Sequence, residues 1–197
     1  ALSRRHILLT AVLLPAFGRA QTAKPVKVEG LVFAGEANVG GAPLVLNGVG
    51  LRAVAWVKGY AAGLYLTKRA ANATAVLATP GAKRLDIRLL LDVSMEEFSK
   101  SLHRGIGRNT SAADVAKMKD RIEKFDTLLD GIGKVKKKDV LTIDWVPASG
   151  TVLSLNGKAR GEPITGEDFY GALLRIFIGD KVSDEELKTG LLGGPVL

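Results

Sequence analysis

The sequence predicts a single α+β domain in which helices pack on one face of a large antiparallel β-sheet. Three observations indicate this class. Segments with the period-two pattern of strands fill the first part of the chain, helical segments with a period of about 3.6 residues follow, and a second group of strands and helices closes it. Because strands and helices are segregated rather than alternating, we expect an antiparallel sheet. A chain of 197 residues suffices for one domain with a sizeable core.

The first twenty residues predict an export signal. Arg4 and Arg5 precede the apolar run 7–17, and small residues follow. This is the three-part pattern of a secretory signal peptide, so we expect 1–20 to be removed and 21–197 to form a periplasmic or secreted domain. The arginine pair also resembles a twin-arginine motif, which leaves the export route open. The apolar run is shorter than the roughly 20 residues of a spanning helix, so we expect no stable membrane anchor.

The composition narrows the classes of function. There is no cysteine, and the two histidines are His6 and His103, so the chain lacks the clustered ligands of a transition-metal site and the groups of a Cys–His nucleophile. We therefore expect no metal and no cofactor. Without the three arginines of the predicted signal, 25 basic and 20 acidic residues leave a net charge of +5, which favours an anionic partner or simple solubility. No basic stripe with interleaved aromatic residues predicts nucleic-acid binding.

Apolar and β-branched runs punctuated by glycine predict the strands. In 84–92, Leu85, Ile87 and Leu89 alternate with charged residues, as in a half-buried strand. Asn156–Gly157 predicts a hairpin turn, because both residues tolerate positive φ. The predicted strands are 26–33, 43–47, 51–57, 59–66, 84–92, a segment that begins at 139, and 151–155.

Capping residues and apolar stripes predict four helices. Ser94 opens a capping box, and a helix follows to about His103. The second helix begins near Ser111 and has the strongest periodic pattern in the chain. The third begins at 165–168, and a last short helix begins at 183–186. The stripe of the second helix consists of Val115, Met118, Ile122, Phe125, Leu129 and Ile132.

Several charged and glycine-rich motifs have structural interpretations that we prefer to functional ones. The paired acids Glu96–Glu97 and Glu185–Glu186 lie in first helical turns, where they complement the helix dipole. The glycines of 48–50 lack the spacing of a phosphate-binding loop. The basic run 134–138 is interpreted as a solvated turn, with contact to an anionic membrane surface as the weaker alternative.

Two neighbouring predicted strands carry the most telling polar residues. Arg52, Lys58, Tyr60 and Tyr65 lie there among small and apolar residues. A guanidinium held near apolar walls favours an anion, and a phenol beside it can donate to the same oxygen. The residues alone support equally the alternative that Arg52 pairs with an internal acid while the tyrosines fill the core.

Several separated motifs also carry a resemblance to a known family. They are 47–52, 58–66, 80–85, 138–147, 150–151, 156–157, 166–169, 178–180, 187–188 and 191–193. With these motifs in this order, the chain resembles the bacterial chalcone isomerase-like proteins over about residues 26–194. The resemblance implies a ligand cleft between sheet and helices. Plant enzymes of this fold cyclise chalcones and plastid relatives bind fatty acids, with an arginine at the ligand that corresponds to Arg52 and a neighbour that corresponds to Tyr60.

The resemblance also predicts that chalcone isomerase activity is absent. The helix that carries the enzyme's tyrosine, lysine and asparagine corresponds to a segment with Phe98, Ser101 and Gly105 at those positions. Losing donors that act on developing charge removes orders of magnitude of rate. We expect a protein that binds a small hydrophobic or anionic ligand. The candidate ligand-binding residues are Arg52, Tyr60, Tyr65, Phe98 and Tyr170.

Two other functions stay open at this point. The first is an isomerase or lyase that uses Arg52 and Tyr60 as electrophile and acid on an enone. The second is a structural or interaction module, in the form of a homodimer, in which the cleft is closed.

Overall fold

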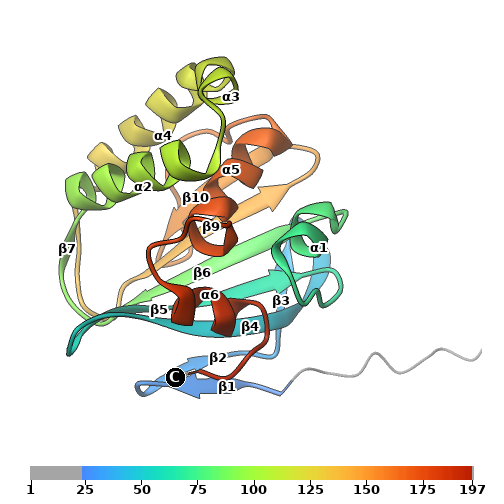
Figure 1. The fold of residues 1–197 in the computed structure, drawn as a ribbon, viewed down its shortest axis with the longest axis vertical. Helices are drawn as coiled ribbons and strands as arrows, with labels where there is room; N and C mark the ends of the chain where they lie inside the picture. Colours follow the sequence, from blue (N-terminus) through green and yellow to red (C-terminus); the bar gives the residue numbers. More distant parts are fainter. Residues whose placement is uncertain (1–23, 197) are drawn as a thin grey trace, which may run out of the picture.

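A computed structural model describes residues 24–196, so the predicted signal peptide lies outside the described residues. Its centre is a curled seven-stranded antiparallel sheet with the strand order β11-β10-β9-β6-β5-β4-β3 (Figure 1). The strands of this sheet are β3 (Glu36–Val39), β4 (Ala42–Val54), β5 (Val57–Leu66), β6 (Lys83–Leu89), β9 (Val140–Val146), β10 (Gly150–Leu155) and β11 (Lys158–Ala159). The predicted α+β class with a large antiparallel sheet is confirmed.

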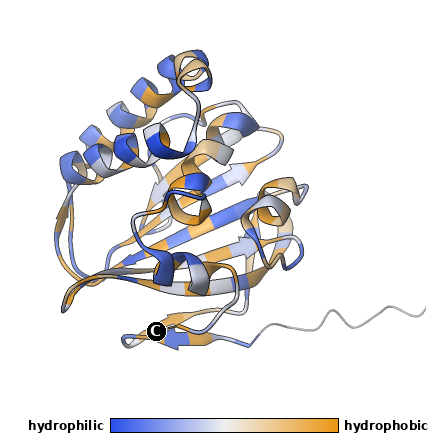
Figure 2. Cartoon of the chain, viewed as in Figure 1, coloured by the Kyte–Doolittle hydropathy of each residue, from blue (hydrophilic) through white to orange (hydrophobic). Residues whose placement is uncertain are grey.

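The helices pack against one face of the sheet, as predicted (Figure 1). Along α2 and α4, hydrophobic residues alternate with hydrophilic ones, as expected of helices with one buried side (Figure 2). The main core lies between the layer of helices, including α5 and α6, and the strands β5, β6, β9 and β10. Within the described residues the helices are α1 (Ala73–Ala78), α2 (Met95–Asn109), α3 (Ala112–Lys117), α4 (Lys119–Ile132), α5 (Glu167–Ile178) and α6 (Glu185–Leu191).

A small hairpin contributes to a second core on the other face of the sheet. Its strands are β1 (Val26–Val28) and β2 (Leu31–Phe33), in place of the single strand predicted over 26–33. Glu29 and Gly30 both have positive φ, so the chain turns back between the two short strands. Another short pair, β7 (Val93–Ser94) with β8 (Lys134–Val135), joins the two ends of the α2–α4 unit.

The long strand β4 replaces two strands that were predicted separately. Its pairing with β5 shifts register between Leu46 and Gly48, so Asn47 forms an irregularity without ending the strand. The buried Asn47 side chain donates to the carbonyl oxygen of Leu191 at 2.8 Å and accepts from the backbone N–H of Ala70 at 2.7 Å. One amide therefore fixes the end of α6 against the sheet.

The four predicted helices lie at the predicted places in the chain, but some of them end at other residues than predicted. Ser94 caps α2 by accepting from the backbone N–H of Glu96, and the helix runs six residues beyond His103, to Asn109. The predicted second helix is interrupted at Met118, which separates α3 from α4. Its apolar stripe is buried from Met118 to Leu129, and the two end residues, Val115 and Ile132, are partly buried against the same core. The turn at Asn156–Gly157 has the predicted positive φ at both residues.

The glycines of β4 allow α6 to lie directly on the strand. A Cβ atom at Gly48 would collide with the carbonyl oxygen of Gly190, and one at Gly50 with that of Leu187. A Cβ atom at Gly190 would in turn collide with the carbonyl oxygen of Val49. This close approach brings the first residues of α6 beside Arg52. Among the helices of residues 24–196, none combines the length and the hydropathy of a membrane-spanning segment.

Candidate functional site

A cavity of about 350 Å³ lies between the sheet and the helices α2, α5 and α6. Pockets for small ligands begin at about this size, and they are typically apolar with a few polar groups. Most of the wall here is aliphatic or aromatic. Its lining residues are Arg52, Val54, Val57, Gly59, Tyr60, Ile87, Leu89, Leu91, Val93, Met95, Glu97, Phe98, Ser101, Leu102, Val135, Leu141, Ile176, Phe177, Val182, Ser183, Asp184 and Leu187.

Arg52 and Tyr60 are direct cross-strand partners at this wall. Arg52 on β4 lies opposite Tyr60 on β5, and Tyr60 lies opposite Leu89 on β6. Side chains of directly opposed residues in an antiparallel sheet project from the same face. The predicted pairing of a guanidinium with a phenol on one surface is therefore a consequence of strand register.

Asp184 neutralises the charge of Arg52. A carboxylate oxygen of Asp184 lies 2.8 Å from Nη1 of Arg52, and the side chains are 8% and 26% exposed respectively. The other carboxylate oxygen of Asp184 accepts from the backbone N–H of Leu187 at 2.8 Å and caps α6. The alternative interpretation of Arg52, pairing with an internal acid, is thus realised, but at the wall of a cavity.

The ion pair uses one edge of the guanidinium only. Nη1 of Arg52 donates to Asp184 and, at 3.5 Å, to the carbonyl oxygen of Ala53. Within residues 24–196, Nε and Nη2 make no hydrogen bond. A carboxylate accepts two parallel N–H bonds from such an edge. Arg52 can therefore bind an anion while it keeps Asp184.

Tyr60 presents a protonated hydroxyl at the same place. Burial raises the pKa of Tyr60 well above its usual value, the positive charge of Arg52 lowers it in part, and Asp184 raises it further. Its hydroxyl makes no hydrogen bond within the described chain. A phenol with a raised pKa stays a donor at neutral pH, which suits binding of an anion better than transfer of a proton.

Helix α2 carries the three positions that correspond to the tyrosine, lysine and asparagine of chalcone isomerase, and two of them lie at the cavity. Phe98 and Ser101 both line it, whereas Gly105 packs against α5, where an added Cβ would lie 2.6 Å from a methyl carbon of Ile176. The helix that resembles the catalytic helix therefore faces the cavity with a phenyl ring and one hydroxyl.

Tyr65 and Tyr170 do not lie at the cavity. Tyr65 is five residues from Tyr60 on the same strand and so projects from the opposite face, where its hydroxyl donates to the carbonyl oxygen of Ala34 at 3.0 Å. Tyr170 lies near the other end of α5, packs beside Trp145 with 6.0 Å between ring centroids, and donates to the carbonyl oxygen of Ile143 at 3.3 Å. Both tyrosines belong to the protein cores.

A second ionic group lies on the opposite face of the sheet. Arg84 donates to both oxygens of Asp144, at 2.7 and 2.6 Å, and Arg88 donates to both oxygens of Asp86, at 3.1 and 2.9 Å. Burial raises the pKa of Asp144, and the hydrogen bond from Arg84 opposes this shift. Arg88 also lies 4.4 Å from the ring centre of Phe33. Unlike Arg52, both of these arginines already give their Nε and Nη2 edge to a carboxylate, so we assign them to structure.

Metal ligands are not gathered anywhere in residues 24–196, where no group of three His, Cys, Asp or Glu side chains has metal-binding geometry. His103 pairs with Asp126 at 2.7 Å on the exposed side of α2.

Sequence reasoning missed Asp184 as part of the site. It was noted only as one of the residues that begin the last helix. Asp184 stands 132 positions after Arg52, and its double role arises from the packing of α6 on β4. The closely spaced glycines of β4 were the available clue that a backbone lies on this strand.

Together these features define an α+β protein with an apolar cavity between sheet and helices, whose wall carries an arginine with one free edge. The sequence matches the model of the chalcone isomerase-like family over residues 25–193, and the chain belongs to that family. Among solved structures, a fatty-acid binding protein of Arabidopsis thaliana is similar, with a TM-score of 0.63 and 15% identity over 86% of this chain and 96% of that chain. At this identity the likeness shows the fold. The curated proteins contained no match.

Proposed function

We propose that this protein binds a small apolar anion, such as a fatty acid, in the cavity beside Arg52. The observation that carries the proposal is the free edge of the Arg52 guanidinium at the end of an apolar space. The similar plant protein is described as a fatty-acid binding protein, which supports the same class of ligand here.

The polar end of the cavity fits a carboxylate. Nε and Nη2 of Arg52 supply two parallel donors, and Tyr60 on the next strand supplies a third. The aliphatic chain of the ligand would then lie along the wall formed by Leu89, Phe98 and Phe177. Removing such a chain from water provides most of the favourable free energy, about 0.8 kcal/mol for each buried methylene.

Asp184 limits the strength of this binding. Its carboxylate repels a bound anion and shares the charge of Arg52. The site therefore holds an anion mainly through directed hydrogen bonds and burial of the chain, with little net charge. This arrangement favours a reversible carrier over tight capture.

Calorimetric titration with dodecanoate and with its methyl ester tests the proposal. The acid should bind at least about tenfold more tightly than the ester, because the neutral ester lacks the negative charge and the two equivalent oxygens that would accept from Nε and Nη2 of Arg52. Equal affinities would contradict the proposed role of Arg52, and an absence of binding by both would contradict the proposed function. Native mass spectrometry of freshly purified protein should also show a copurifying acid.

Removing Arg52 alone would leave Asp184 buried without a partner, which destabilises the fold by itself. The matched comparison is therefore the double variant Arg52→Ala with Asp184→Asn against Asp184→Asn alone. Asparagine still caps α6. We expect only the variant with Arg52 to distinguish the acid from the ester.

We also propose that the mature protein is exported, since residues 4–17 have the pattern of a signal peptide. Amino-terminal sequencing of protein from the periplasmic fraction should find a start at Gln21. Accumulation of uncleaved chain in the cytoplasm would contradict this proposal.

A further inference from the structure

The free end of the β4–β5 hairpin exposes three large apolar side chains. Trp56 is 89% exposed, Val54 is 61% exposed and Val57 is 50% exposed. Hydrophobic colouring reaches the tip of this hairpin, which extends beyond the neighbouring strands (Figures 1 and 2). Single exposed apolar residues are ordinary, whereas a contiguous group that includes a fully projecting tryptophan marks an interaction site.

This apolar tip is continuous with the mouth of the cavity. Val54 and Val57 line the cavity and are also exposed to solvent. Val54 lies two residues from Arg52, and Val57 lies three residues from Tyr60, in both cases toward the tip of the hairpin. A ligand that leaves the polar end of the cavity at this side therefore passes the hairpin tip.

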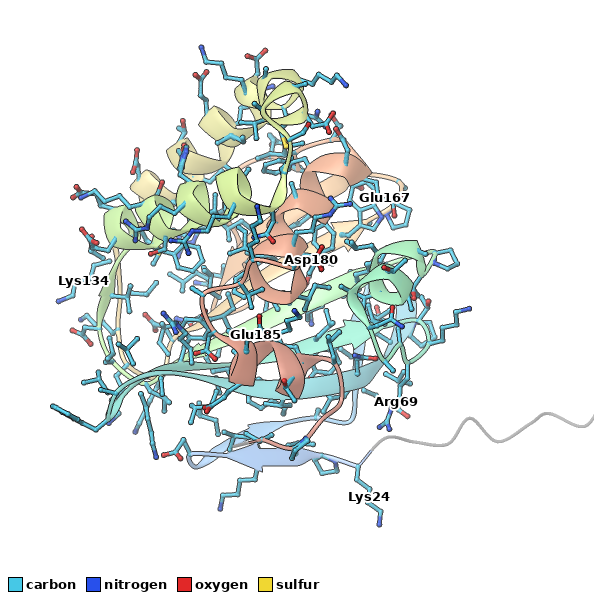
Figure 3. All side chains as sticks on the ribbon, in the orientation of Figure 1. Lys24, Arg69, Lys134, Glu167, Asp180 and Glu185 are labelled. Atoms are coloured by element: carbon cyan, nitrogen blue, oxygen red, sulfur yellow. The ribbon has the colours of Figure 1, made fainter. Side chains whose placement is uncertain are left out.

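A basic turn, residues 134–138, lies at the same end of the sheet as the hairpin tip. The backbone N–H of Leu90 donates to Gly59 next to the hairpin, and that of Lys138 donates to Leu89. The turn is thus separated from the hairpin by one strand. Figure 3 shows Lys134 pointing outward from this edge of the molecule.

Three lysines of this turn have free charges. Lys136, Lys137 and Lys138 are exposed and form no ion pair within residues 24–196, whereas Lys134 is paired with Asp92 at 3.2 Å. The nearby Asp139 uses its carboxylate to accept from the backbone N–H of Lys136, at 2.7 Å, and from Asn156.

We propose that the β4–β5 tip and the lysine turn form a docking surface for an anionic phospholipid bilayer. Tryptophan prefers the interface between lipid headgroups and acyl chains, where its ring is buried and its N–H stays near polar groups. Each lysine near an anionic bilayer raises the partition coefficient about fivefold. The surface combines both components, whereas a purely apolar partner would not require the lysines. Docking here places the mouth of the cavity against the lipid.

The test uses the full mature chain and vesicles of phosphatidylcholine, with or without an equal share of phosphatidylglycerol. Trp145 is buried, so the variant Trp145→Phe leaves the exposed Trp56 as the fluorescent reporter. We expect sedimentation with the anionic vesicles, a blue shift of the Trp56 emission and its protection from acrylamide. Emission that does not change on sedimentation would overturn the proposal.

Variants separate the two components of the surface. Trp56→Ala should lower the partition coefficient about tenfold, and the triple variant Lys136→Gln, Lys137→Gln, Lys138→Gln should lower it at least about tenfold. The matched control is the triple variant Lys117→Gln, Lys119→Gln, Lys124→Gln. These are exposed lysines of α3 and α4 at the other end of the helical layer, and their replacement should have little effect. Equal losses in both triple variants would indicate a general charge effect and contradict a specific surface.

Docking to a bilayer is a separate claim from ligand binding in the cavity, and the two can be tested independently. Trp56→Ala should change the affinity for dodecanoate in solution by no more than about twofold. A protein that binds dodecanoate but ignores vesicles overturns docking alone. Sedimentation equilibrium that shows a dimer with Trp56 buried would assign the surface to a second copy and also overturn docking to lipid.

Discussion

Arg52 and Asp184 form an ion pair of 2.8 Å at the wall of the cavity, and the same aspartate caps the last helix. The residue that would bind a ligand is thereby connected to the position of α6. The pair leaves Nε and Nη2 of Arg52 without hydrogen bonds in the described chain. The guanidinium is thus divided into an occupied edge and a free edge.

Asp184→Asn should strengthen binding of dodecanoate about fivefold or more. The substitution removes a negative charge beside the proposed carboxylate, and a unit charge about 4 Å away costs about 1 kcal/mol even in water. Asparagine still caps α6 but loses the ion pair with Arg52, so the stability of the free protein should fall by about 1 kcal/mol or more. Calorimetric titration and urea unfolding measure the two effects. Weaker binding by this variant would show that the anion does not lie beside Asp184.

Tyr60→Phe should lower the affinity for dodecanoate about tenfold, because it removes one donor to a charged acceptor. The Tyr60 hydroxyl has no partner within the described chain, so the free protein should keep its stability.

Tyr65→Phe is the matched control for this loss of a hydroxyl. It removes the bond to the carbonyl oxygen of Ala34 and should cost about 1 kcal/mol of stability with no change in affinity. The reverse pattern, in which Tyr65 matters for binding and Tyr60 for stability, would refute the assignment of the two faces.

Gly50→Ala should destabilise the protein by about 2 kcal/mol or more, because the new methyl group collides with backbone atoms of Leu187. The displaced α6 should also weaken the Arg52–Asp184 pair. Gly107→Ala on α2 has free space around the added carbon, and it should stabilise the helix by up to about 1 kcal/mol. Urea unfolding of both variants checks the prediction. Equal effects would show that α6 does not lie on the strand as described.

The stability of the protein should decrease as the pH is lowered, and Asp139 should account for part of this decrease. The backbone N–H of Lys136 and the side chain of Asn156 hold the pKa of Asp139 below its usual value. A carboxyl whose pKa is lowered by folding stabilises the protein above its unfolded pKa of about 3.9, and this stabilisation is lost as the pH falls through the lower folded value. The difference in unfolding free energy between wild type and Asp139→Asn should therefore be constant above about pH 5 and shrink below about pH 4. A difference that does not vary with pH would contradict the shift.

Local patterns predicted most of the fold. The alternation at Leu85, Ile87 and Leu89 and the stripe from Met118 to Leu129 both face the main core as expected. Short elements escaped prediction, because a helix of six residues such as α1 is too short to show a period. The separation of β1 from β2 depends on the turn at Glu29–Gly30, which apolar content alone does not indicate.

The candidate site was predictable only in part. Arg52, Tyr60 and Phe98 come together at the cavity, but Tyr65 could have been set aside from the sequence, since an odd spacing from Tyr60 on one strand puts it on the other face. The partner of Arg52 was beyond prediction, because nothing local connects β4 with a helix near the end of the chain. The exposure of Trp56 at the hairpin tip could likewise not be predicted, because it depends on where the neighbouring strands end.

The central claim is that an anionic ligand lies in the cavity with its charged group on the free edge of Arg52. A crystal structure of the protein with dodecanoate tests this most directly. We predict a carboxylate within hydrogen-bond distance of Nε and Nη2 of Arg52 and of the Tyr60 hydroxyl, with the acyl chain between the sheet and α2. A carboxylate bound elsewhere, or a chain that enters with its methyl end at Arg52, would contradict the account.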